Sequence, residues 1–281
     1  MSLGRRKVGI DDPARWVFNR MADVYDARPP YPPALVDALA ELAGRPGATV
    51  GDLGAGTGHL ALPLAARGLD VVAVEPAAAM LQRLREGARS RGLSMRALHG
   101  AAEALPLAKS SLDLVVVCEA LHYMDAELTG SEIGRVLARG GALAVITSEI
   151  TPTPFMRAVW SAIEAAVPRR PRDLGAAHDQ LSSMARVRLV DERRFQDETP
   201  VDAGTLERIL RSFSFVGPAM NPARFEAFRA RLEAIDEPAV WARTFVMRWG
   251  RRPARTNRQR HDAREPRAAR APVAPEDGRP S

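Results

Sequence analysis

The stretch Val50-Gly-Asp-Leu-Gly-Ala-Gly-Thr-Gly-His59, together with Val71-Val-Ala-Val-Glu-Pro76, decides the fold of this chain. The first stretch is a short strand that leads into three alternating glycines, and the second is an apolar strand that ends in a carboxylate. Because Gly54, Gly56 and Gly58 have no Cβ atom, the backbone can turn tightly and approach a ligand closely. A carboxylate 21 residues after the first glycine suits the two hydroxyls of a ribose. The two stretches predict a nucleoside-containing cofactor across the carboxyl ends of a parallel sheet.

The residues around the glycines favour one kind of cofactor over another. A dinucleotide-binding turn reads G-x-G-x-x-G, but its third glycine would fall on His59. Asp52 stands two residues before the first glycine, where its charge would repel a pyrophosphate and attract an ammonium or sulfonium group. An NAD-type enzyme is therefore the less favoured alternative.

The motif D-x-G-x-G-x-G, with an acidic residue closing the second strand, resembles that of the class I S-adenosylmethionine-dependent methyltransferases. Further segments continue the resemblance, at 99–106, 112–123 and 135–141. The segment Tyr25 to Pro32 is similar to one that closes over the cofactor in a small-molecule branch of the family, of methyltransferase type 11. The resemblance covers about residues 20–150.

The resemblance implies a set of residues that bind S-adenosylmethionine. The glycine turn would face its methionine part, and Glu75 would accept hydrogen bonds from the ribose diol. An alternative for Glu75 is an exposed acid that caps the helix beginning near Ala77. Met80 would pack on the adenine ring, with Ala101 and Ala102 beside it, although all three could be ordinary core residues. The cofactor-binding residues predicted in this way are Tyr25, Arg28, Asp52, Gly54, Ala55, Gly56, Gly58, Glu75, Pro76, Met80, Ala101, Ala102, Glu103 and Cys118.

The chain departs from the family pattern at three positions. Gly51 replaces a large apolar residue in the first strand, and Arg139 stands where a proline is usual. Ala102 lacks the carboxylate that often contacts the adenine amino group, so that contact would come from the backbone or from Glu103. None of these positions supplies a group that the chemistry requires.

Alternating strand and helix patterns predict a doubly wound α/β fold, with a seven-stranded, mostly parallel, Rossmann-like sheet and a helical substrate cover. The predicted strands lie near 49–53, 71–75, 95–99, 112–118 and 142–148, and the helices between them near 58–66, 77–89 and 130–138. We divide the chain into an N-terminal helical lid (1–45), a cofactor-binding core (46–150), a cover with the last two strands (151–250), and a disordered tail (251–281).

Patterns outside the core predict further elements. Asp12-Pro13 begins a helix that reaches about Ala22, the proline-rich segment 25–33 is a crossing loop, and 34–42 is an amphipathic helix. In the cover we expect helices over 154–167, after Asp202 and after Asn221, an irregular segment over 169–186, and strands at Phe195 and 243–249.

Two side chains after the fourth strand are candidates for a general base. His122 is the first, because that strand end would face the reacting methyl group, and Glu119 is the second. A histidine that only lines the cofactor site is an equal alternative. Cys118, the single cysteine, is expected to be a buried strand residue and not a nucleophile.

Composition limits the other possibilities. One cysteine excludes an internal disulfide and makes a zinc cluster implausible, so no metal is expected. No apolar run approaches the ~20 residues that span a bilayer, and no secretory signal is visible, which indicates a cytoplasmic protein without a membrane partner. Of the net charge of +6, residues 251–281 carry +5, with nine arginines against four acids. The core itself is therefore nearly neutral, and nucleic acid is an unfavoured partner.

The sequence thus predicts a methyltransferase that acts on a small organic acceptor. The alternative is an RNA or protein methyltransferase recruited by the basic tail, and a cofactor-binding protein without catalysis is a third possibility. Arginines in the cover at 169, 170, 172, 186 and 188 could suit an anionic acceptor or simply be solvated. The acceptor and the oligomeric state are not predicted.

Overall fold

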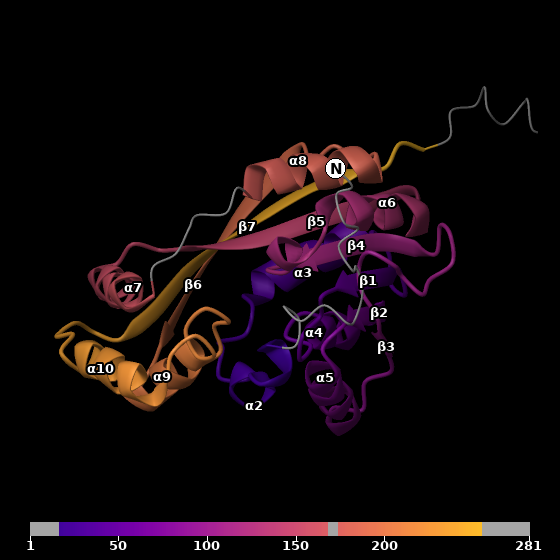
Figure 1. Ribbon diagram of the computed structural model, residues 1–281. Helices are drawn as coiled ribbons and strands as arrows, with labels where there is room; N and C mark the ends of the chain where they lie inside the picture. The colour runs from indigo at the N-terminus through magenta and orange to yellow at the C-terminus, as the bar shows by residue number, and fades with distance from the viewer. Residues whose placement is uncertain (1–16, 168–173, 255–281) are drawn as a thin grey trace, which may run out of the picture.

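A computed structural model describes residues 17–167 and 174–254 and shows one seven-stranded sheet with helices on both faces (Figure 1). The strand order is β3-β2-β1-β4-β5-β7-β6. The strands are β1 Thr49–Leu53, β2 Asp70–Glu75, β3 Arg96–His99, β4 Leu112–Cys118, β5 Leu137–Ile150, β6 Asp191–Pro200 and β7 Val240–Arg251.

The first five strands are parallel, and the last two make the sheet mixed. β1 pairs with β2 and β4, β2 with β3, and β4 with β5, all in parallel, whereas β7 runs antiparallel to both β5 and β6. Chain order reverses at β1, where β2 lies on one side and β4 on the other. This is the switch point at which open α/β sheets bind ligands. The predicted fold class is confirmed.

Alternate residues of the strands face two separate apolar cores. On one face, Val71 and Ala73 pack with helices α3 Pro33–Ala43, α4 Ala61–Ala66 and α5 Ala78–Ser90. On the other face, Val72 and Val74 belong to the core that contains α6 Ala126–Val136 and α8 Leu174–Ala185. Both sides of the central strands are thus buried, which explains their nearly continuous apolar sequence.

Helices α7 Pro154–Ala166, α9 Ala203–Arg211 and α10 Pro222–Glu233 gather at one end of the long strands β6 and β7 (Figure 1). They share a third apolar core, which includes Phe155, Phe228 and Trp241. Asp202 and Asn221 cap α9 and α10 as predicted, because their side-chain oxygens accept hydrogen bonds from backbone N–H groups of the first turn. We call these three helices, with the segment 212–221 between α9 and α10, the cover.

Several predicted elements need correction. The segment 169–186 is not irregular throughout, since α8 occupies 174–185 and packs closely on α6, where a Cβ atom on Gly130 would lie 2.6 Å from the Leu181 carbonyl oxygen. The helix expected at 130–138 is α6, which begins earlier because Asp125 caps it, and β5 begins at Leu137. The missing side chain of Gly51 is no packing defect, because Leu112 Cδ1 lies 2.6 Å from where its Cβ would be.

Two predicted elements at the ends of the chain, the helix from Asp12 and the tail, lie partly outside the described residues. The helix expected to begin at Asp12 would start outside the described residues. The described part is helical at 17–19 and again in α2 Ala22–Tyr25, which extends into the segment expected to be a loop. The expected tail begins within the last strand, because β7 runs to Arg251, and the rest of it from 255 is not described. Within the described residues, none of the helices has the length and apolar character needed to cross a membrane.

Candidate functional site

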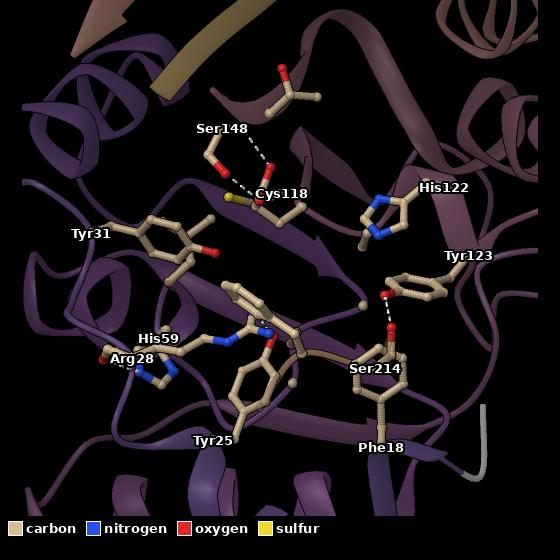
Figure 2. A pocket seen from close by; sticks show the side chains of 18 of the residues that line it. Phe18, Tyr25, Arg28, Tyr31, His59, Cys118, His122, Tyr123, Ser148 and Ser214 are labelled. Carbon is tan, nitrogen blue, oxygen red and sulfur yellow. Dashed lines mark hydrogen bonds between the residues drawn. The ribbon is translucent and has the colours of Figure 1, made fainter. Parts of the chain in front are cut away.

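A cavity of about 740 Å³ lies at the carboxyl ends of β1, β2, β4 and β5. Its remaining walls come from the segment around α2 and from the cover. Figure 2 shows the side chains of Tyr25, Arg28, Tyr31, His122 and Ser148 arranged around this common space. Ligand sites usually measure roughly 300–1,000 Å³, so this cavity is large enough for more than one small molecule.

The glycine turn forms the floor of the cavity. Gly54 and Gly56 have φ angles of +76° and +57°, which residues with a side chain rarely adopt. A Cβ atom on Gly54 would lie 2.7 Å from that of Ala120, whereas one on Gly56 would meet only Tyr25, at 3.7 Å. The turn therefore presents bare backbone to the cavity at Gly56.

Glu75 holds this turn in place. Its carboxylate is buried and accepts hydrogen bonds from the Gly56 N–H and from the Ala77 N–H, both at 2.8 Å. The residue is thus not an exposed helix cap, although it does bind the residue that precedes α5. Because each carboxylate oxygen can accept more than one hydrogen bond, Glu75 can bind the turn and still accept from a ligand in the cavity.

Asp52 is a buried carboxylate in the cavity wall. The residue is only 2% exposed, and its Oδ2 atom has no hydrogen-bond partner among the residues that the structure describes. Burial, with a smaller effect of the neighbouring Glu75 charge, raises the pKa of Asp52 to about 7. A cation in the cavity would remove this penalty, since an opposite charge nearby favours the ionised carboxylate.

The base candidates Glu119 and His122 both line the cavity. Glu119 has a φ of +54°, an uncommon conformation outside glycine, and its carboxylate accepts hydrogen bonds from the backbone N–H and the hydroxyl of Ser148, at 2.5 and 2.6 Å. Burial raises the pKa of Glu119, while the Ser148 hydrogen bonds and the charges of Arg28 and Arg243 oppose that rise. A strained residue held this firmly at a strand end is typical of a functional position.

Arg28 joins the N-terminal segment to the cover. Its Nε donates to the Ser212 hydroxyl at 2.8 Å and an Nη to the Ser212 carbonyl at 2.7 Å, although the two residues are 184 positions apart. The guanidinium lies 4.2 Å from the Tyr25 ring centre and 5.0 Å from that of Phe213. It has no carboxylate partner within the described residues, so its charge remains available to an anionic group.

Comparison with known proteins agrees with this arrangement. The family model described as "Methyltransferase domain" matches residues 51–145. A methyltransferase of Mycobacterium tuberculosis, itself uncharacterised, is 44% identical over 147 residues, which are 52% of this chain and 55% of that protein. A second uncharacterised protein of the same organism is 30% identical over 190 residues, covering 64% of this chain and 68% of its own.

This chain belongs to the class I methyltransferase family. The fold agrees with that of the YcgJ protein from Bacillus subtilis, with a TM-score of 0.54 over 78% of this chain and 98% of that one, at 17% sequence identity. The chain matches only about half the length of the first M. tuberculosis relative, so family membership does not by itself establish an acceptor.

Most of the residues that the sequence assigns to the cofactor line the cavity of this family member. These are Tyr25, Arg28, Asp52, Gly54, Ala55, Gly56, Glu75, Pro76, Met80, Ala102 and Cys118. Met80 is also packed in a small cluster with Met21, Ala22 and Ala77, so the two alternatives for this residue are compatible.

Three of the predicted cofactor residues lie outside the cavity lining. A Cβ atom on Gly58 would point at Leu62 and Leu84, which shows that this glycine permits helix packing. Glu103 is buried, and its Oε1 accepts from the backbone N–H of Asp125 at the start of α6. Ala101 is a buried residue of a turn, in a β-bridge with Ala104.

The sequence does not predict most of the cavity wall that the cover and strand β7 provide. Arg243 on β7 and Trp160, Phe213, Phe215 and Trp241 line the cavity, yet no local motif distinguishes them from core residues. Among the five arginines considered for an anionic acceptor, Arg186 and Arg188 are exposed and do not line the cavity, and 169, 170 and 172 lie outside the described residues.

We predict that Asp52→Asn stabilises the ligand-free protein at pH 8. In the unfolded chain the carboxyl group has its ordinary pKa of 3.8, and in the fold the pKa is about 7. The fold therefore binds the proton more tightly, and the penalty grows as the pH rises from 4 to 7 and then stays constant. Denaturant unfolding should show a gain on the order of 4 kcal/mol at pH 8, from about three pK units at about 1.4 kcal/mol each, and this gain should shrink toward pH 4.

Asp236→Asn, at an exposed loop position, serves as the control and should show no pH-dependent difference. A variant D52N that is less stable than the parent at every pH would show that Asp52 has a partner which the structure lacks.

Proposed function

We propose that this protein transfers a methyl group from S-adenosylmethionine to a small organic acceptor. The observation that carries the proposal is the combination of a bare glycine turn with two buried carboxylates at neighbouring strand ends, only one of which is satisfied. A cation would stabilise the ionised form of the buried Asp52, whose Oδ2 has no partner among the described residues, and a donor with an ammonium and a sulfonium group provides one. A pyrophosphate would add negative charge to the same place.

The residues of the cavity fit the parts of this cofactor. Glu75 would accept hydrogen bonds from the ribose hydroxyls, Asp52 would lie with the positively charged methionine part, and Met80 and Ala102 would border the adenine. Arg28, which has no carboxylate partner among the described residues, suits the methionine carboxylate. When bound, the cofactor supplies an electrophilic methyl group and its sulfur leaves without needing a proton.

The chain's own contribution is to hold an acceptor in line and to receive its proton. Orientation can supply roughly 7–11 kcal/mol, whereas a general base supplies a typical 10²–10⁴-fold. Positioning therefore matters most. The firm attachment of Glu119 to Ser148 suits it to accept a hydrogen bond from the acceptor, and His122, in the short 3₁₀ helix Leu121–Tyr123, is the alternative proton acceptor.

Two observations support a small acceptor over RNA or protein. The cavity is covered by the N-terminal segment and the cover, which meet through Arg28 and Ser212. The part of the cavity between them is lined by apolar rings, which suits a small ligand better than a polymer backbone.

Glu75→Ala should weaken binding of S-adenosylhomocysteine by tenfold or more in isothermal titration calorimetry. Each charge-assisted hydrogen bond is worth roughly 1.5–3 kcal/mol, and the variant also loses the support of Gly56. Glu86→Ala, on the surface of α5, is the matched control and should bind like the parent. If the parent binds NADH in the same titration and not S-adenosylhomocysteine, the proposed function is wrong.

The two base candidates can be separated with any acceptor that the enzyme turns over. His122→Ala should lower kcat by 10²-fold or more, with cofactor affinity changed less than threefold, if His122 takes the proton. A loss confined to cofactor affinity would mean that His122 only lines the cavity. The same comparison for Glu119→Gln assigns the second candidate.

A further inference from the structure

The cover and strand β7 contribute a connected set of aromatic rings to the cavity. Trp160 on α7, Phe213 and Phe215 after α9, and Trp241 on β7 all line it. Phe213 and Phe215 are nearly parallel, with ring centres 5.3 Å apart. Phe215 lies 6.4 Å from Trp160, and Phe213 lies 6.0 Å from Trp241. We call these four residues the aromatic wall.

The aromatic wall is only partly buried. Trp241 is 3% exposed, but Trp160, Phe213 and Phe215 are only half-buried, although a compact apolar core lies directly behind them. Exposed apolar surface costs about 25 cal/mol per Å², so a cavity lined by these partly buried rings favours an apolar occupant that covers more of their surface. Flat rings on the wall also favour a flat partner, because aromatic pairs gain about 0.5–1.5 kcal/mol beyond their buried area.

Two contacts connect the aromatic wall to the base candidates. The Arg28 guanidinium lies over the Phe213 ring, and its charge acts on Glu119. Ser214, between the two phenylalanines, hydrogen-bonds the Tyr123 hydroxyl at 2.7 Å. Figure 2 shows Tyr123 and His122 beside one another on the same side of the cavity as this hydrogen bond.

The polar groups near the aromatic wall favour an acceptor molecule whose reacting group is a hydroxyl oxygen over one whose reacting group is an amine. The side chain of Arg243 is 13% exposed, its buried Nε has no partner among the described residues, and its charge also acts on Glu119. Arg243 forms an ion pair with Asp197, at 2.6 Å, whereas Arg28 has no carboxylate partner among the described residues. Because Arg28 is assigned to the methionine carboxylate, Arg243 is the cation that acts on the acceptor. Its unpartnered Nε–H can donate to a hydroxyl oxygen that gains negative charge, whereas a protonated amine offers no acceptor atom and would be repelled.

We infer that the aromatic wall is the acceptor subsite and that it binds a flat aromatic molecule bearing a hydroxyl group. The rings of the molecule lie against Trp160, Phe213 and Phe215, and its hydroxyl faces Glu119 and His122. This inference rests on the proposed function, because it takes the remainder of the cavity to hold the cofactor.

The test uses the full-length protein saturated with S-adenosylhomocysteine, titrated with 2-naphthol in a calorimeter. Two further ligands keep a fused two-ring carbon skeleton. Decahydro-2-naphthol is saturated and not flat, and 2-naphthylmethylamine carries a positive charge. We expect 2-naphthol to bind at least tenfold more tightly than either of them.

Variants locate the binding to the aromatic wall. Trp160→Leu and Phe215→Leu should weaken the binding of 2-naphthol by about fivefold or more and change the affinity for S-adenosylhomocysteine by less than twofold. Trp249→Leu is the matched control, since Trp249 is also half-buried but does not line the cavity. It should bind both ligands like the parent.

The outcomes separate this inference from the proposed function. If S-adenosylhomocysteine binds but 2-naphthol does not, or the saturated alcohol or the amine binds as tightly, the subsite is wrong and the methyl-transfer proposal stands. If the wall variants also bind S-adenosylhomocysteine more weakly, the rings form part of the cofactor site and the inference is also overturned. Failure of the parent to bind S-adenosylhomocysteine would instead count against the proposed function.

Discussion

Two carboxylates at neighbouring strand ends constrain the whole site. β1 and β2 pair in parallel, so Asp52 and Glu75 reach the same edge of the sheet. Glu75 is satisfied by backbone N–H groups of the glycine turn and of the start of α5. Asp52 is buried beside it with an oxygen that has no described partner, and its pKa is raised as a result. A fold keeps such a group only where something else compensates for it, and the adjoining cavity is where that compensation can come from.

The rest of the molecule can be understood as the enclosure of this edge. Residues far apart in sequence close the cavity, since Arg28 binds Ser212 and Tyr123 binds Ser214. The long strands β6 and β7 carry the cover out to the place where it meets the N-terminal segment (Figure 1). The sheet therefore positions the carboxylates, and the cover encloses the space in front of them.

The sequence predicts features that depend on residues close together in the chain better than features that depend on residues far apart in it. The helix caps at Asp202 and Asn221 depend on neighbours within a few residues, and both are confirmed. The glycine turn and the acid at the end of β2 lie where the sequence predicts them, whereas their roles toward a cofactor stay predictions. Helix α8 was missed because its stability comes from close packing on the small residue Gly130 of α6, far away in the chain. The aromatic wall and Arg243 were missed for the same reason: before the cover is folded, a Trp or Phe that lines a cavity has the same pattern as one in the core.

A related limit concerns Gly58 and Glu103, two of the three predicted cofactor residues that do not line the cavity. Both stand at positions that fit the motif, but a motif does not say in which direction a side chain or a missing Cβ points. In the structure these positions face the helix packing around α4 and the start of α6.

The most direct test of the account is the number of protons released when S-adenosylmethionine binds at pH 6, obtained from the binding enthalpy in buffers of different ionisation enthalpy. Asp52 with a pKa near 7 is mostly protonated at this pH, and a cation beside it lowers that pKa. The account predicts release of close to one proton by the parent and none by Asp52→Asn. Equal enthalpies in all buffers for the parent, or the same release by both proteins, would contradict it.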